Sequence, residues 1–473
     1  MLKNKLLINF FSSGLQAIAV QVLGSIFFYF ISIYLSKEIF GVINLMNAVC
    51  LFVTTLLGFG LEQVVTRRIA ASKRSDWAAA AFFAHSLIGF LLTALVLLIL
   101  NAVFKNQAGI YRYLPCFFAA QGLIYIGIPL KQFLNAKERF TPYGIIAVIS
   151  NIGKIVMALL MQKNHRLNIH KVIIILIGAA VFELACLLIY ILTKTDFSFK
   201  LHFNAYKKLL KESSAQYLSV IFDMSLSRMD WILVGIIAGN SVVLADYSFA
   251  YRAFELARLP VFIIAPVLLP RLARLMSSNN KPGVADQQQI NSFIKTEMFF
   301  AVLIPLILNI LWVPLVSLIT KGKYGNTNSL QFLILSLCIP FQFSINMLWS
   351  LTFGAKKYKR VTFITIVCAT VNVLLNVVLI KKFNGVGAAV AFFITTLLQG
   401  YLYYKLVCKE IMVLSLSPLL LFITAAIVYV IATSINVHFV IQLIIAIALY
   451  LSVAVLSKQI SRQHIYDFKQ FLS

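Results

Sequence analysis

Apolar runs of about twenty residues follow one another along the whole chain, and this feature constrains the fold more than any other. Each run is about long enough to cross a ~30 Å hydrocarbon layer as a helix, and short polar segments separate the runs. Because 61% of the 473 residues are apolar and only 12% are charged, water cannot solvate most of the chain. The sequence therefore predicts an all-helical polytopic membrane protein and excludes a soluble fold.

The apolar runs between polar breaks predict about fourteen transmembrane helices. The stretch from Leu6 to Ser36 carries no charge and is too long for the apolar region of a signal peptide, so we expect it to form the first span. The predicted spans cover residues 10–35, 39–61, 78–104, 113–130, 141–162, 172–193, 215–238, 242–270, 298–320, 330–354, 361–380, 384–407, 414–434 and 438–457.

Basic residues gather on one side of this predicted topology. With the N-terminus inside, 27 of the 41 Lys and Arg residues lie in inner segments and 10 in outer segments, the rest lying inside spans. This asymmetry predicts that both termini are cytoplasmic, in a bacterial inner membrane. The net charge of +26 thus follows from topology and lipid headgroups, and does not indicate nucleic-acid binding.

Similar segments recur in the two halves of the chain. Tyr34–Gly41 resembles Ala238–Ala245, and an arginine follows each at the same separation; Asn135–Phe140 likewise resembles Gly354–Lys359. Internal repeats of this kind are typical of transporters. We therefore predict an N-terminal lobe of six helices at 1–200, a C-terminal lobe of six helices at 201–409, and two additional helices with a cytoplasmic tail at 410–473.

Three sets of motifs occur in order along the chain. They are Tyr34-Leu-Ser-Lys-Glu-Ile-Phe-Gly with Gly58-Phe-Gly-Leu-Glu-Gln-Val-Val-Thr-Arg-Arg; Asp230-Trp-Ile-Leu-Val-Gly with Tyr247-Ser-Phe-Ala-Tyr-Arg and Pro270-Arg-Leu-Ala; and Asn372-Val-Leu-Leu-Asn with Asn384-Gly-Val-Gly-Ala-Ala. Together they resemble the multidrug/oligosaccharidyl-lipid/polysaccharide (MOP) exporter superfamily, and within it the Wzx-type polysaccharide flippases.

The resemblance implies two lobes around a central cavity that opens alternately to each side of the membrane. It also implies a cargo of undecaprenyl-pyrophosphate-linked repeat units for O-antigen, capsule or exopolysaccharide, with a polysaccharide polymerase and chain-length proteins as partners. Sister families depend on residues in the first helix: drug exporters commonly use a carboxylate, and peptidoglycan-precursor flippases use arginine. Here the first span offers only Gln16 and Gln21 as large polar groups, which argues against both sister functions.

Ionisable side chains inside the spans are the candidate functional site, because a charge at mid-membrane is costly unless it faces water or a partner. We predict that Lys154, Arg228, Arg252 and Arg258 line a cationic cavity that binds pyrophosphate. Glu183, Asp223, Asp230 and Glu255 are candidates for coupling to H⁺ or Na⁺, or for charge pairing. The structural alternative pairs Lys154 with Glu183, Asp230 with Arg252, and Asp223 with Arg258.

Neither a catalytic motif nor a cofactor-binding motif stands out. The sequence has no recognisable nucleophile motif, zinc-type cysteine spacing or phosphate-binding glycine loop, so we predict a transporter that is not an enzyme and uses no cofactor. His85 is expected to be a hydrogen-bonded packing residue rather than a proton relay. A cation-coupled drug exporter stays the main alternative; a membrane glycosyltransferase or polymerase is disfavoured because the predicted outer loops are short.

Overall fold

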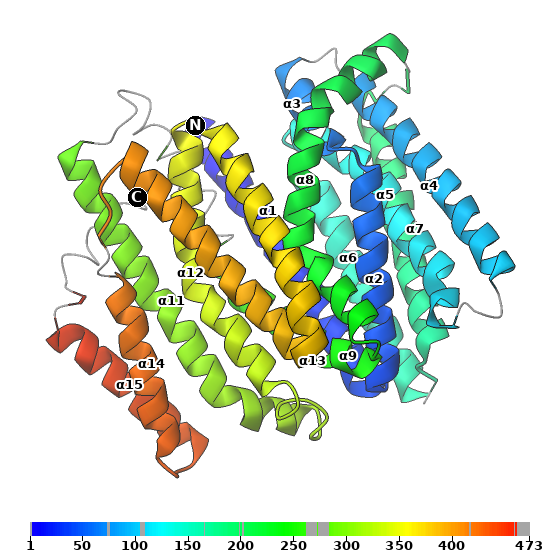
Figure 1. The fold of residues 1–473 in the computed structure, drawn as a ribbon. Helices are drawn as coiled ribbons and strands as arrows, with labels where there is room; N and C mark the ends of the chain where they lie inside the picture. The colour runs from blue at the N-terminus through cyan, green and yellow to red at the C-terminus, as the bar shows by residue number, and fades with distance from the viewer. Residues whose placement is uncertain are drawn as a thin grey trace. The chain divides into compact units, whose positions relative to one another are not determined.

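The computed structural model describes residues 2–72, 76–104, 109–164, 166–197, 199–200, 203–261, 272, 283–415, 418–457 and 459–460. Figure 1 shows that these ranges form long helices joined by short connections. Arg271 and most of the Pro270–Ala273 motif, together with the side chain of Gln16, lie outside the described residues.

Every predicted span overlaps a helix, which confirms the all-helical polytopic fold. Among the described residues, nine helices are long and apolar enough to cross a membrane, and the stretches Ile18–Tyr34 and Pro418–Ser434 are shorter apolar helices. The helices are α1 (Leu2–Tyr34), α2 (Lys37–Leu57), α3 (Leu61–Ala71), α4 (Trp77–Val103), the 3₁₀ helix η1 (Gly109–Tyr113), α5 (Leu114–Ala136), α6 (Phe140–Lys163), α7 (Ile169–Lys194), α8 (Phe203–Ile237), α9 (Ser241–Ala257), α11 (Val284–Ile319), α12 (Ser329–Gly354), α13 (Tyr358–Glu410), α14 (Pro418–Ser434) and α15 (Phe439–Leu456).

The short helix α3 was not predicted as a separate element. α2 ends at Leu57, and the chain turns through Phe59 and Gly60, whose φ angles are 48° and 67°. Glycine adopts this left-handed backbone readily, and the site is also tight, since a Cβ on Gly60 would lie 2.7 Å from the backbone nitrogen of Tyr217. The break therefore redirects the chain so that α3 packs against α8.

α13 contains two predicted spans joined at a break. Asn384 has φ 51° and ψ −132°, which is non-helical, and it separates two helical segments. Gly387 lies just after the break, and a Cβ there would be 2.2 Å from the carbonyl oxygen of Leu379. The absence of a side chain at Gly387 thus lets the second segment pass close to the end of the first.

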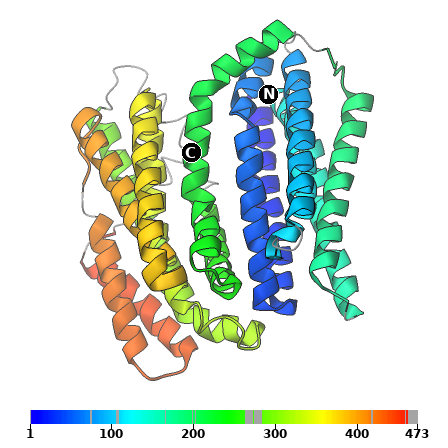
Figure 2. The same cartoon turned by 45° about the vertical axis from the view of Figure 1, so that its right-hand side comes forward.

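The chain forms two compact units, Met1–Ala245 and Asp246–Ser473. In the first unit, α1 packs against α6, α5 packs against α4 and α7, and α8 lies along α2 and α3 (Figure 2). The boundary between the two compact units, after Ala245, lies later in the chain than the predicted lobe boundary at residue 200. The reason is that α8 packs on α2 and α3 of the first unit. The six-helix lobes stay a prediction from the repeats.

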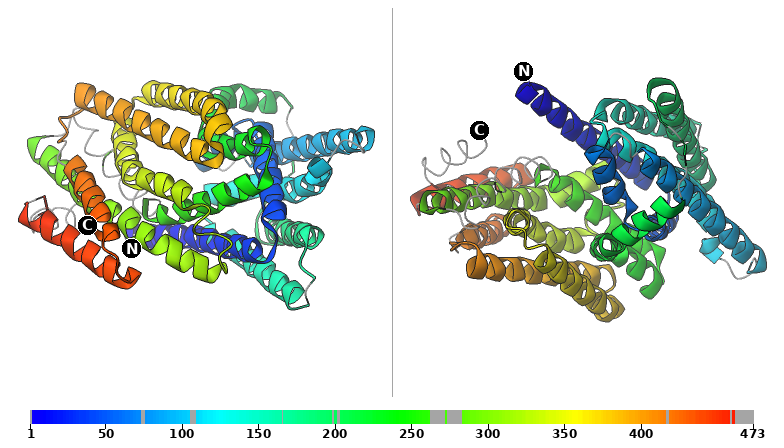
Figure 3. Two further views of the ribbon diagram at one scale, coloured as in Figure 1. Left: turned by 60° about the horizontal axis from the view of Figure 1, so that its bottom comes forward. Right: turned by 90° about the horizontal axis from the view of Figure 1, so that it is seen from above.

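In the second unit, α12 packs between α11 and α13, and the last two helices contact α11 (Figure 3). Met298 and Val302 of α11 lie in an apolar cluster with Leu421 of α14 and Tyr450 of α15. The Tyr450 hydroxyl donates a hydrogen bond of 3.1 Å to the Phe299 carbonyl. α11 is thus the main support of the C-terminal pair.

The close approach at Gly387 can be tested by adding one methyl group. Gly387→Ala should lower the free energy of unfolding by about 1–3 kcal/mol, because the new Cβ has no room beside the Leu379 carbonyl. Gly178→Ala is the control, since a Cβ at Gly178 of α7 meets nothing within 4 Å. Thermal unfolding of the purified variants in detergent measures the difference, and equal melting temperatures would contradict the expectation.

Candidate functional site

The predicted cations of the second unit lie on and just after α9. Arg252 Nη1 is 2.9 Å from Glu255 Oε2, and the two side chains keep only 17% and 10% exposure. Residues three apart on a helix are neighbours, so the spacing itself brings this pair together. A carboxylate beside a poorly solvated guanidinium offsets part of the cost of burying it. Glu255 therefore serves as a local counter-ion for Arg252.

Arg258 lies where α9 ends. Its guanidinium carbon is 5.3 Å from the centre of the Phe254 ring, a distance at which a cation is attracted to an aromatic face. Pro260 has no backbone N–H to donate to the carbonyl four residues before it. The helix ends at Ala257, Arg258 occupies a turn, and residues 259–261 are helical again.

The ring that Arg258 contacts belongs to a cluster of buried aromatic side chains. Phe254 and Tyr251 of α9 both contact Phe392 of α13, with ring centres 5.5 and 5.7 Å apart. All three rings are buried. A low-dielectric wall of this kind strengthens the attraction between an arginine and an anion.

The predicted charges on α8 belong to the first unit. The Arg228 guanidinium lies 4.9 Å from the centre of the Trp231 ring. Asp230 is buried, and its Oδ1 accepts a hydrogen bond of 2.9 Å from the Trp231 backbone nitrogen. Asp223 is exposed. The predicted pairing of Asp223 with Arg258 and of Asp230 with Arg252 joins residues of different units, so it stays a prediction.

The predicted pairing of Lys154 with Glu183 is wrong. Glu183 of α7 instead forms an ion pair of 2.5 Å with Lys131 of α5. The Lys154 ammonium lies 5.9 Å from the centre of the Phe27 ring on α1, because α6 packs against α1 as well as α7. The predicted span 113–130 leaves Lys131 in the cytoplasmic segment that follows it, whereas α5 extends to Ala136. Glu183 is therefore a structural partner of a residue that the sequence placed outside the membrane.

Two further acidic residues were missed by the sequence argument. Glu62 begins α3 and accepts a hydrogen bond of 3.3 Å from the Gln132 side chain of α5. Burial raises the pKa of the Glu62 carboxyl, whereas the hydrogen bond from Gln132 and the charge of Lys131 lower it. The second is Glu297 of α11, which is 3% exposed. Both lie at the edge of a predicted span, where acidic residues are usually solvated.

His85 connects three helices of the first unit. Its Nε2 lies 2.7 Å from the Leu57 carbonyl of α2, and its Nδ1 lies 2.7 Å from the Tyr206 hydroxyl of α8. Because a carbonyl can only accept, Nε2 carries the proton, and in the neutral ring Nδ1 accepts from the hydroxyl. Both ring nitrogens are thus hydrogen-bonded, as predicted for a packing residue.

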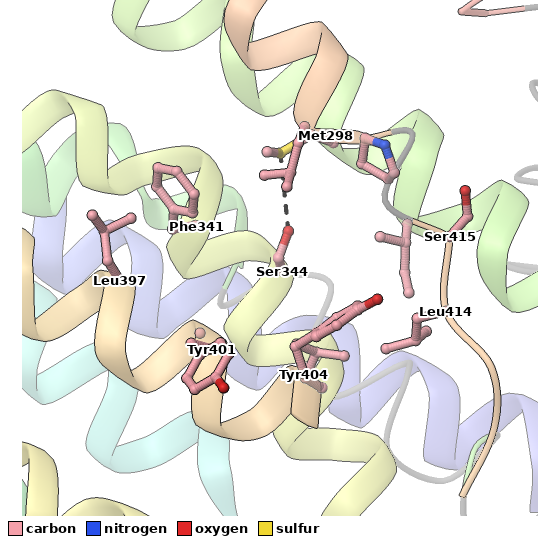
Figure 4. Close-up of a pocket in the computed structure, with 13 residues that line it drawn as sticks. Met298, Phe341, Ser344, Leu397, Tyr401, Tyr404, Leu414 and Ser415 are labelled. Atoms are coloured by element: carbon pink, nitrogen blue, oxygen red, sulfur yellow. Dashed lines mark hydrogen bonds between the residues drawn. The ribbon is translucent and has the colours of Figure 1, made fainter. Parts of the chain in front are cut away.

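An apolar pocket of about 420 Å³ lies in the second unit. Met298 of α11, Phe341 of α12 and Tyr404 of α13 point into it (Figure 4). One wall is the segment before α14, which Asn291 holds: its amide donates to the Val413 carbonyl at 3.2 Å and accepts from the Ser415 backbone at 3.1 Å. None of the predicted site residues lines this pocket, and its chemistry suits a hydrocarbon chain rather than a charged group.

Known proteins share this fold. The chain resembles the structure of the lipid II flippase MurJ in an inward closed conformation, with a TM-score of 0.73 and 17% identity over 94% of this chain and 99% of that chain. It also resembles an inward-facing multidrug resistance MATE family transporter of the MOP superfamily, with a TM-score of 0.63 and 14% identity over 84% and 95% of the two chains. The MATE transporter VcmN of Vibrio cholerae, in its bent form, gives a TM-score of 0.57 and 16% identity over 86% and 98%.

At these identities the structural likeness establishes the fold alone. No curated protein matches the sequence significantly. The fold and the apolar helices are those of a multi-pass membrane protein, and a match to a family model places it among the MOP-superfamily transporters, as predicted. Residues 123–458 match the family model described as "Lipid II flippase MurJ". Because this match covers well over half of the chain, the protein belongs to the MurJ family of flippases for lipid-linked precursors.

The narrower resemblance to Wzx-type flippases is not supported, and the matching family is one that the first helix had argued against. The match begins at residue 123 and therefore omits the span that lacks an arginine. The absence of one arginine from the first span was too weak an argument to exclude the MurJ family. The sequence pattern of that family matches the later helices, within residues 123–458.

The ion pair between Lys131 and Glu183 gives a testable prediction for stability. Glu183→Leu should lower the free energy of unfolding by about 1–3 kcal/mol, because it leaves a poorly solvated ammonium without its counter-ion. Lys131→Met should have a similar effect, and the double variant should recover most of the loss. Thermal unfolding in detergent measures all three variants. Additive losses in the double variant would contradict the pairing.

Proposed function

We propose that the protein is a flippase that moves a polyprenyl-diphosphate-linked saccharide across a bacterial cytoplasmic membrane, with both termini in the cytoplasm. Membership of a family of flippases for lipid-linked precursors supports this proposal. The structural observation that carries it is the presence of two arginines in a membrane protein, Arg252 at 17% exposure beside Glu255 and Arg258 against the buried Phe254 ring. Arginine suits bidentate contact with phosphate oxygens.

Glu255 gives Arg252 a defined role in this mechanism. While the site is empty, the carboxylate holds the guanidinium in place and reduces the cost of its burial. An incoming diphosphate offers more negative charge and more acceptor oxygens than one carboxylate, so it displaces Glu255 from Arg252. The headgroup crosses as the two halves rearrange, and the polyprenyl tail stays in lipid. We expect no chemical step on the cargo, so an ion gradient or later consumption of the product drives transport.

Removing the arginines tests this assignment. Arg252→Ala and Arg258→Ala should each reduce the flipping rate by roughly ten- to a hundredfold. This range corresponds to the loss of one hydrogen bond to a charged group, which contributes about 1.5–3 kcal/mol. Arg360→Ala is the matched control, because the Arg360 side chain is 63% exposed. Flipping of a fluorescent lipid-diphosphate saccharide in proteoliposomes measures the rate. Normal rates in both arginine variants would remove Arg252 and Arg258 from the binding site.

Two cargoes are supported by different observations. The matching family is described by its action on lipid II, which makes lipid II the first candidate. A repeat unit for a surface polysaccharide is the second, because the first span, Leu6–Ser36, has no charged residue and lies outside the matched range.

Vesicles loaded with one cargo at a time distinguish these candidates. Transport of lipid II assigns the protein to peptidoglycan synthesis, whereas transport of a diphosphate-linked oligosaccharide without a peptide assigns it to polysaccharide export. Vesicles containing Arg252→Ala are the control for leakage. The absence of transport of either cargo by the wild-type protein would contradict the proposed function.

A further inference from the structure

Glu297 is a buried acid that the proposed mechanism does not use. It lies on α11 and is 3% exposed. Ile290, Phe293 and Ala301 lie one or two turns away on the same face of α11, and all are fully buried. The carboxyl therefore sits in the middle of an interior apolar stripe of this helix.

Neither carboxyl oxygen of Glu297 has a hydrogen-bond partner. α12 also carries buried polar atoms without a hydrogen-bond partner, namely the Asn346 amide nitrogen and the Ser350 hydroxyl. α11 and α12 are joined by the turn at Thr320–Asn328 and pack side by side (Figure 1). Counting residues from that turn places Glu297 and Ser350 at about the same depth.

Among the described helices, the three that pack most extensively against α11 bring no charge to Glu297. α12, α14 and α15 contact α11, and the residues of these three helices include no Asp, Glu, Lys, Arg or His. Their titratable groups are Cys338, Tyr429 and Tyr450, and Tyr401 and Tyr404 of α13 line the neighbouring pocket. Lys295 lies on α11 itself, but residues two apart do not face each other on a helix.

An ionised carboxylate buried here would be poorly solvated and would have no counter-ion on α12, α14 or α15, which costs far more than burying the neutral acid. A metal cation does not solve this problem, since alkali and alkaline-earth ions need several oxygen ligands. Among the described residues, no group of three or more His, Cys, Asp or Glu side chains could hold a metal ion. A proton removes the charge of the carboxyl with no further ligand.

We propose that Glu297 is a proton-binding site of the second unit and that its protonation and deprotonation couple flipping to the proton gradient. The coupling step rests on the proposed flippase function, whereas proton binding does not. Ile294 and Met298, which flank Glu297 on α11, line the apolar pocket beside α14. Widening of that pocket would admit water to the carboxyl and release the proton, and closing it would require the proton to return.

Infrared spectroscopy of the full-length protein in proteoliposomes tests the binding step. At neutral pH the wild type should show a carboxylic-acid C=O band that disappears in Glu297→Gln and is retained in Glu410→Gln. Glu410 is the matched control, because it is ionised in a surface pair with Lys357 at 2.9 Å. The glutamine variant keeps the size of the side chain and should keep the wild-type melting temperature. A wild-type spectrum unchanged by Glu297→Gln would overturn the proposal.

Transport assays in the same vesicles test the coupling. A pH gradient should accelerate flipping by the wild type and by Glu410→Gln, whereas Glu297→Gln should flip at one rate with or without the gradient. A Na⁺ gradient at constant pH should have no effect on either protein. Acceleration by Na⁺ that is lost in Glu297→Gln, or an undiminished pH response in that variant, would overturn the proton assignment. Failure of the wild type to flip any cargo would instead contradict the proposed function. In that case the infrared band would still show whether Glu297 binds a proton.

Discussion

The cost of placing charge in hydrocarbon governs how this chain uses its few intramembrane charges. Glu183 is neutralised by Lys131 of the next helix but one, and Glu255 is paired with Arg252 one turn away. Arg228, Arg258 and Lys154 lie against aromatic faces. The two ion pairs differ in consequence: the pair between two helices fixes their packing, whereas the pair within one helix leaves the packing of other helices unchanged when it opens.

This distinction separates the charges that support the fold from those that serve transport in the proposed mechanism. The Lys131–Glu183 pair joins α5 and α7, which already pack together, so it adds to an existing contact. Arg252 and Glu255 lie on one helix, and their pair can open without separating two helices. A pair that breaks at little structural cost is the arrangement that a cycle of binding and release requires.

The spans could be predicted from the sequence because apolar length is a local property of the chain. α13 illustrates this: the sequence predicts one span that ends at residue 380 and another that begins at Asn384, and the structure has its break at Asn384. The end of α2 was placed less well, because the turn through Phe59 and Gly60 depends on α8, more than a hundred residues away. Side-chain partners were predicted least well. Lys131 appeared to belong to a loop, and nothing local indicates that Lys154 faces α1 or that Glu297 is buried on all sides.

The C-terminal pair of helices has a simple attachment. α14 and α15 share their apolar cluster with α11. The side-chain amide of Asn291, on that same helix, also forms hydrogen bonds with the backbone of the segment that precedes α14. A module anchored mainly to one host helix can be gained or lost in evolution with little rearrangement elsewhere, since most of the helical bundle does not rely on it for packing. The pair would also move together with α11: any tilt of α11 during a transport cycle would tilt α14 and α15 by a similar amount. The surface that this unit presents to the surrounding lipid would then move as well.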